Sequence, residues 1–564
     1  MRMQKIKQVM PCLFITTLSF FKSSSQPLPD SIIKKIDLLF TRWDNKASPG
    51  CVIGVVRNDS LIYSKGYGMA NLEYNVPIST ETIFHMASVS KQFTAYSIVL
   101  LARQGKLRLD DDIRKYLPWF PDLHEKITIL NLLNHTSGIR DQWQLLNIAG
   151  IRPNDVITQD QLIRILSTQQ VLNFKPGKQY NYSNSNFTLA AEIIKNISGQ
   201  SLRKFTDSAI FKPLGMTKTH FRDDLTEIEN RAASYSRIDN TRFANSIWSN
   251  SGVGATNLYT NTPDMSKWII NFYNTKAGDK KDIDLLTQKT KLNSGAEQNY
   301  ALGILSGLYK GWREFSHAGG DAGYRSYVMV YPDLKMGFMV FSNIGDVGTY
   351  AKAHQIADLF ISNTKSNDAI QKIDSSKTIL KDDSQLQKYT GHYIYEEGQR
   401  IELFIKEKKL YLSSDIFGDS IVLSRENENT FQLLNGSSVK VDLSINAKKE
   451  PSVALIFPED ENEKYFFTGY DKNEIIAEEK LKAYTGSYYS PELECRYTIF
   501  LKDHRLFIKS LRYSETQITF SGPDHLYTGM FWMNHLRILR TNNNITGFEV
   551  NSGRVQHLKF NKTE

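Results

Sequence analysis

The fold of this 564-residue chain is decided by the stretch FHMASVSKQFTAYSIVLLARQGKLRLDDDI, residues 84–113. Between residues 93 and 102 only Thr94 and Ser97 interrupt an apolar run, which predicts a helix buried on every side. Lys91 stands at the entrance of that helix. Burying a lysine destabilises a fold unless another group pairs with it, so the position of Lys91 points to a function.

Ser88 and Lys91 form an S-x-x-K pattern, which places both side chains on one face of a helix. Free N–H groups and the helix dipole favour negative charge in the first turn, where Ser88 is expected. A serine hydroxyl becomes a strong nucleophile when a base takes its proton, and burial gives a lysine the lowered pKa that this role needs. The pattern has other copies in this chain, but the copy at Ser88 is the one that opens a buried helix. We therefore interpret this pair as a nucleophile and its base.

A second candidate segment is PGKQYNYSNSNF, residues 176–187. Tyr182 and Asn184 fall in a loop just before a predicted helix. A tyrosine phenol there can relay protons beside Lys91, and an asparagine amide can both donate to and accept from a substrate amide.

A third candidate segment is FSHAGGDAGYRS, residues 315–326, which we expect to form a turn before a returning pair of strands. His317 opens the segment, and Gly319 and Gly320 allow a substrate to lie against an edge strand. The backbone N–H of Gly320 is then a candidate donor to the substrate. A histidine two residues before a glycine carries little information by itself.

In this order the three segments resemble the motifs of the serine β-lactamase and penicillin-binding-protein superfamily, specifically its class C-like branch, which includes D-aminopeptidases and esterases (peptidase family S12 type). The resemblance extends to ASVSKQFTA, LRLDDDIRKYLP and ITILNLLNHTSGI and covers about residues 28–360. It implies that Ser88 is the acylated nucleophile, that Lys91 accepts its proton, and that Tyr182 protonates the leaving amine and activates water. It also implies that Asn184 orients the substrate amide, and that the N–H groups of Ser88 and Gly320 form an oxyanion hole.

The chain departs from that pattern at His317. Penicillin-recognising members usually carry Lys-Thr-Gly in the third motif, whereas this chain has His-Ala-Gly, as the D-aminopeptidase-like branch also does. A histidine is mostly neutral near pH 7, so we expect weaker capture of a substrate carboxylate. This favours peptides or amides with a free amino terminus over β-lactams. By the same resemblance His135 belongs to a structural turn.

The expected fold class is α+β. A β-lactamase-like domain over residues 26–362 combines an antiparallel sheet with a helical region. The polar segment 363–385 is interpreted as a linker, and two small all-β barrel domains follow over 386–472 and 473–564. The barrels are predicted from an internal repeat, because LQKYTGHY and LKAYTGSY both open on L-x-x-Y-T-G-x-Y and lead into alternating strands.

Residues 1–25 have the pattern of a signal peptide, with basic MRMQKIK before an apolar run that is too short to span a membrane. We expect export to the periplasm or beyond the cell, with an uncleaved anchor as the alternative and no other membrane span. The net charge of +9 is weak for so long a chain and argues against nucleic acid. Cys51 and Cys495 are expected to be free thiols in different domains, and no metal or cofactor pattern is present in the sequence.

The predicted function is an exported serine hydrolase that cleaves small peptide or amide substrates through an acyl-enzyme. Substrates containing D-residues, with peptidoglycan as one source, fit the resemblance. An esterase, a weak β-lactamase or a D,D-carboxypeptidase of the same fold is the alternative within the enzyme class. A non-catalytic sensor that binds cell-wall peptides or β-lactams is the alternative outside it. The sequence leaves the oligomeric state open.

Overall fold

The structure is a computed structural model, and part of the chain is described in it. The described residues are 28–247, 249–362, 385–395, 400–414, 418–434, 439–447, 449–456, 464–470, 477–521 and 524–563. The expected signal peptide and nearly all of the expected linker lie outside these residues.

A six-stranded antiparallel sheet organises the N-terminal domain, residues 28–362, and confirms the predicted α+β class. Its strands, in spatial order, are β12 Leu305–Tyr309, β13 Trp312–Asp321, β14 Tyr324–Tyr331, β15 Met336–Ser342, β1 Cys51–Arg57 and β2 Ser60–Tyr67. Short strands flank it: β3 Met69–Asn71, β4 Val76–Pro77, β5 Phe84–His85, β6 His220–Phe221, β7 Tyr235–Arg237, β8 Phe243–Asn245, β9 Leu258–Thr260, β10 Thr290–Lys291 and β11 Glu297–Gln298.

The predicted turn around His317 is wrong, because strand β13 continues through this segment to Asp321. Glycine and alanine have low strand propensity, which hides the strand in the sequence, whereas pairing with β14 stabilises it. From His317 onward β13 has a ladder partner only on the β14 side among the described residues, because β12 reaches no further than Ser316. This end of β13 therefore behaves as an edge strand.

Helices cover both faces of the sheet, which explains why strand β1 reads as a nearly continuous apolar run. The cluster on one face includes residues of α1 and α11, and the cluster on the other face includes residues of α2, α6 and α9. The helices of this domain are α1 Asp30–Phe40, α2 Ser90–Arg103, α3 Ile129–Leu133, α4 Gln142–Ile148, α5 Gln159–Ser167, α6 Asn184–Ser198, α7 Leu202–Thr206, α8 Lys212–Leu214, α9 Thr262–Asn271, α10 Lys280–Thr287 and α11 Thr349–Ala357.

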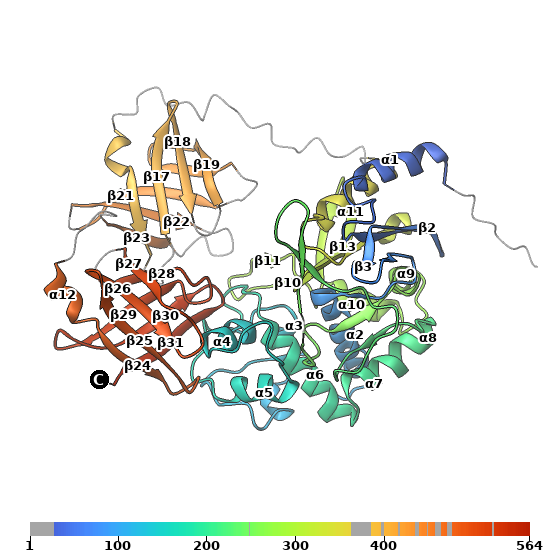
Figure 1. The fold of residues 1–564 in the computed structure, drawn as a ribbon, viewed down its shortest axis with the longest axis horizontal. Helices are drawn as coiled ribbons and strands as arrows, with labels where there is room; N and C mark the ends of the chain where they lie inside the picture. The colour runs from blue at the N-terminus through green and yellow to red at the C-terminus, as the bar shows by residue number, and fades with distance from the viewer. Residues whose placement is uncertain are drawn as a thin grey trace, which may run out of the picture.

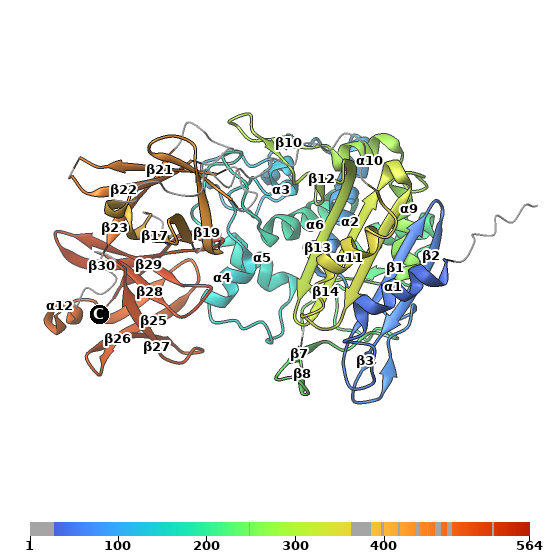
Figure 2. The same cartoon turned by 90° about the horizontal axis from the view of Figure 1, so that it is seen from above.

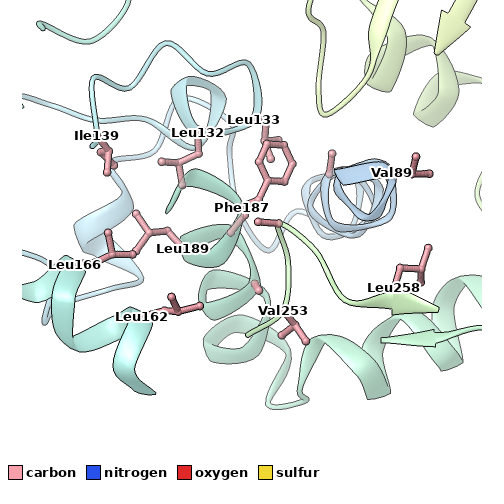
Figure 3. Packing of buried hydrophobic residues seen from close by; sticks show 14 of the residues in the cluster. Val89, Leu132, Leu133, Ile139, Leu162, Leu166, Phe187, Leu189, Val253 and Leu258 are labelled. Carbon is pink, nitrogen blue, oxygen red and sulfur yellow. The ribbon is translucent and has the colours of Figure 1, made fainter. Parts of the chain in front are cut away.

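Helix α2 is the buried helix that the sequence predicts, since every residue from Ser90 to Leu101 is buried. Figure 3 shows this part of the core, with Phe187 of α6 packed between α2 and the Leu132–Leu133 segment of α3. A helix surrounded in this way offers a dry environment for the polar groups at its N-terminus.

Two closed eight-stranded barrels follow, as the repeat predicts. The first barrel contains β16 Gly391–Ile394, β17 Arg400–Lys406, β18 Lys409–Ser414, β19 Gly418–Arg425, β20 Thr430–Leu433, β21 Lys440–Ile445, β22 Pro451–Ile456 and β23 Lys464–Tyr470. After α12 Glu478–Lys482, the second barrel contains β24 Gly486–Ser490, β25 Cys495–Lys502, β26 Arg505–Ser510, β27 Thr516–Phe520, β28 His525–Thr528, β29 His535–Thr541, β30 Asn544–Ser552 and β31 Val555–Lys562.

The second barrel lies against helices α4 and α5 of the N-terminal domain, and the first barrel lies beside it (Figures 1 and 2). The buried apolar residues of the second barrel form one continuous cluster with those of the helical region, whereas the first barrel has a cluster of its own. Cys51 and Cys495 are free, as predicted. Within the described part of the chain, no helix is long and apolar enough to cross a membrane.

Candidate active site

Ser88 lies in a short 3-10 helix, Ala87–Val89, which leads directly into α2. Ala87 adopts a left-handed backbone with φ 46°, a conformation that costs an alanine roughly 1–2 kcal/mol and is common where a fold holds a reactive side chain in place. Ser88 itself is half-buried, so its hydroxyl combines a fixed backbone with partial access to solvent.

The Lys91 ammonium is fully buried and lies among three oxygen acceptors. Its Nζ is 3.0 Å from Ser88 Oγ, 2.9 Å from Asn184 Oδ1 and 2.8 Å from the backbone oxygen of Ala255. Burial lowers the pKa of Lys91 to about 7, against the opposing charge of nearby aspartates. A large fraction of Lys91 is therefore neutral near pH 7 and able to take the proton of Ser88.

The Tyr182 ring covers this lysine, with Lys91 Nζ 4.8 Å from the ring centroid. Burial raises the pKa of the Tyr182 phenol, and a hydrogen bond with Ser88 opposes that rise. Because the lysine pKa is lowered and the tyrosine pKa is raised, Lys91 is the better proton acceptor and Tyr182 remains a proton-bearing phenol. His135 packs its ring 4.2 Å from the Tyr182 ring, and its Nδ1 accepts from the N–H of Ser183, which holds the tyrosine loop in place.

Asn184 begins helix α6 and has both ends of its side chain engaged. Its Oδ1 accepts from Lys91, while its Nδ2 and its backbone N–H both donate to Asp141 Oδ2 at 2.7 Å. Asp141 is also the N-cap of α4, where it accepts from the N–H groups of Trp143 and Gln144. The geometry gives Asn184 a role in positioning Lys91; its contact with a substrate amide stays a prediction.

His317 is buried and neutral in this site. Its Nε2 lies 2.8 Å from the Tyr300 hydroxyl and its Nδ1 lies 2.6 Å from the backbone oxygen of Ala318, so Nδ1 carries the proton and Nε2 accepts. Burial, reinforced by the charge of Lys91, lowers the pKa of His317 to about 3. The third motif therefore brings no positive charge to the site.

The two glycines of β13 have different surroundings. A Cβ at Gly319 would lie 2.2 Å from the backbone oxygen of Met86, so any side chain there would push β13 away from the Ser88 turn. Gly320 is exposed, and a Cβ there would meet its nearest atom, on Arg325, at 3.4 Å. The strand therefore runs close against the Ser88 turn at Gly319 and is open at Gly320.

Three charged residues near Lys91 were not singled out by the sequence patterns: Asp141, Asp321 and Arg554. Asp321 follows Gly320 directly, hydrogen bonds with Thr256, and has its pKa raised to about 6 by burial. Arg554 comes from the second barrel, and its Cζ lies 4.8 Å from the Tyr182 ring centroid. The position of Asp141 ahead of an amphipathic helix is a capping signal that the sequence contains, whereas Arg554 has no local signal.

Comparisons with known proteins give a family match and several relatives. The Beta-lactamase family model matches residues 36–361. Penicillin-binding protein 4* of Bacillus subtilis is 25% identical over 75% of this chain and 96% of its own length. A D-aminopeptidase of Gluconobacter oxydans is 25% identical over 55% of this chain, and protein flp of Staphylococcus aureus (strain MRSA252) is 28% identical over 52%. The chain covers about 60% of the length of these last two relatives.

Among solved structures, the octameric penicillin-binding protein homologue from Pyrococcus abyssi matches with a TM-score of 0.51. It is 22% identical, and the match covers 78% of this chain and 98% of that chain. At this identity the likeness shows a shared fold.

Proposed function

The chain belongs to the Beta-lactamase family, and on that premise we propose that it hydrolyses peptide or amide bonds, with D-residue peptides as the substrate class. It is a serine hydrolase of the β-lactamase fold. We also propose that it is exported, because residues 1–25 have the pattern of a signal peptide.

One observation carries this proposal: a fully buried lysine with a pKa near 7 lies 3.0 Å from the hydroxyl of a half-buried serine. Ser88 Oγ attacks the scissile carbonyl carbon while its proton passes to Lys91 Nζ. The backbone N–H groups of Ser88 and Gly320 stabilise the resulting oxyanion. Loss of one such donor typically lowers the rate by about 100- to 1,000-fold.

Next, Tyr182 donates its proton to the leaving amine and receives a proton from Lys91. Departure of the amine leaves an acyl group on Ser88. A water molecule then attacks the acyl carbon and transfers a proton back through the same pair, which releases the acid and restores the serine. The raised pKa of Tyr182 supports this role, because the phenol keeps its proton until a basic amine develops next to it.

The D-residue class rests on the D-aminopeptidase among the relatives, and the neutral His317 favours peptides or amides over β-lactams. A neutral histidine where penicillin-recognising proteins carry lysine gives no ionic attraction for a β-lactam carboxylate. Esters and β-lactams remain the comparison substrates in any test of this preference.

The test is intact mass with peptide mapping after treatment with a fluorophosphonate, followed by amine release from a panel of D-alanyl amides. We expect one adduct on Ser88 and none in Ser88→Ala. The matched control is Ser201→Ala, which removes another S-x-x-K serine whose hydroxyl caps helix α7, and it should label normally. A folded protein that forms no adduct would favour a binding protein. One that forms an adduct and releases no amine, but turns over an ester or a β-lactam, would favour the alternative enzyme.

A further inference from the structure

The backbone of Arg554 is bonded to the N-terminal domain at three points. Arg554 lies in the turn between β30 and β31, and its N–H donates to Gln144 Oε1 at 2.9 Å. Its carbonyl oxygen accepts from Asn173 Nδ2 at 2.9 Å and from the N–H of Asp141 at 3.2 Å. These bonds do not involve the side chain, so they fix where the guanidinium begins without depending on it.

The guanidinium of Arg554 lies over the Tyr182 ring, and the Arg554 side chain is about half exposed, at 46%. Its nearest carboxylate oxygen is Asp141 Oδ2, 3.9 Å from Nη1, which is too long for a hydrogen bond. That oxygen already accepts two bonds from Asn184. Among the described residues, no side-chain or backbone acceptor lies within hydrogen-bonding distance of the guanidinium, so its donors have no protein partner where it lies over Tyr182.

We propose that Arg554 is a substrate-binding residue, which holds a carboxylate on the leaving portion of the substrate. The guanidinium is always charged, and its planar arrangement of donors matches a carboxylate. Arg554 contacts Tyr182, which acts on the leaving amine in the proposed mechanism, so the group it reaches is attached to that side of the scissile bond. This inference rests on the proposed function and extends it to the substrate class.

The arrangement also accounts for the neutral His317. The third motif supplies no cation, yet a cation from the second barrel, Arg554, lies beside Tyr182 of the same site. The expectation of weak carboxylate capture therefore applies to the third motif, and the second barrel restores that capture from the Tyr182 side.

The test compares D-alanyl-glycine with D-alanyl-glycinamide, which differ in the leaving-group carboxylate alone. Each compound competes with the fluorophosphonate for Ser88, and the concentration that halves the labelling rate is measured relative to the uninhibited rate of the same variant. This readout works whether or not the compound is turned over. We expect the wild-type protein to need about 10- to 100-fold more amide than acid.

The variants separate recognition from structure. Arg554→Gln should bring the ratio between the two compounds close to one, and Arg554→Lys should keep part of it. The control Arg512→Gln removes another arginine of the second barrel, which pairs with Asp155 at the same domain interface, and it should leave the ratio unchanged.

Two results would overturn this inference while leaving the proposed function intact. One is a wild-type ratio near one, including equal failure of both compounds to protect a Ser88 that still labels. The other is an Arg554→Gln variant that weakens both compounds equally, which would mean that the arginine acts through Lys91 and Tyr182. A wild-type protein without a Ser88 adduct would instead remove the proposed function.

Discussion

The two barrels share the same opening motif but differ in how they contact the domain that holds the active site. In each, the second tyrosine of the repeated motif donates its hydroxyl to the backbone oxygen of the first, Tyr393 to Tyr389 at 2.6 Å and Tyr488 to Tyr484 at 2.7 Å. The glycines between them adopt the same left-handed backbone, with φ 145° and 144°. The repeat therefore specifies the local structure at the N-terminal start of each barrel.

Docking depends on residues outside that motif. Glu492 of the second barrel pairs at 2.7 Å with Arg140, which is fully buried. The Tyr497 hydroxyl donates to the backbone oxygen of Ile148, and Gln144 bonds the backbone of Trp532. The first barrel keeps a separate core and has a cation–π contact with the second, in which Arg400 lies over Tyr527. The second barrel therefore docks on the helical region through a few side chains at its surface and shares its apolar core, whereas the first barrel has a core of its own.

The largest expected effect tests the buried ion pair that joins the second barrel. Glu492→Ala leaves Arg140 buried without its carboxylate, and we expect it to reduce the free energy of unfolding by about 3–5 kcal/mol. The matched control is Glu494→Ala, two residues along, which removes an exposed pair with Arg164 and should cost about 0–1 kcal/mol. Denaturant unfolding of both variants measures the difference, and similar losses would contradict the assignment of docking energy to the buried pair.

A second comparison places the same substitution in each barrel. Leu558→Ala and Leu443→Ala both remove a fully buried leucine, and each should cost about 2–5 kcal/mol. Leu558 belongs to the core shared with the helical region. Its variant should therefore lower the midpoint temperature of the calorimetric transition in which Ser88 labelling is also lost. Leu443 belongs to the separate core, so its variant should lower a different transition and leave labelling unchanged. A single transition that shifts equally in both variants would show that the two barrels unfold together.

The smallest expected effect is electrostatic. Activity should fall as pH decreases through about 7, because protonated Lys91 cannot accept the proton of Ser88. The charge of Arg554 helps to lower the pKa of Lys91, so Arg554→Gln should move this limb of the kcat/KM profile to higher pH. The control is Arg425→Gln, which removes an arginine that donates to backbone oxygens of Asn427 and Glu428 within the first barrel, and it should leave the profile in place.

The same lysine affects stability. Its pKa is lowered in the folded protein, so between about pH 7 and the ordinary lysine value of 10.5 the unfolded chain binds more protons than the folded one. The contribution of Lys91 to the free energy of unfolding therefore becomes more favourable as pH rises through that window. Lys91→Met should remove this dependence, and an unchanged slope in that variant would assign it to another group.

Much of the site could be predicted because its signals are local. The apolar run after Lys91 predicted the buried helix, and the structure brings Ser88, Tyr182 and Asn184 to that lysine. The strand through His317 was missed because glycine and alanine hide strand periodicity, and β14 supplies the pairing that overrides propensity. Arg554 could not be predicted, since its place depends on how two domains dock and not on any pattern around it.

The hydrogen bond between Asn173 and Arg554 joins segments that are synthesised at very different times. The two residues are 381 positions apart, and a ribosome that adds about 5–20 residues per second needs roughly 20–75 s to cover that distance. During this interval the helical region already exists as nascent chain, while the barrel strands that complete its apolar core have not been made. The nascent chain therefore passes through a stage in which the apolar face of the helical region is exposed, and chaperone binding is expected to help most at that stage. Hydrolysis is least expected then, because the substrate site still lacks Arg554.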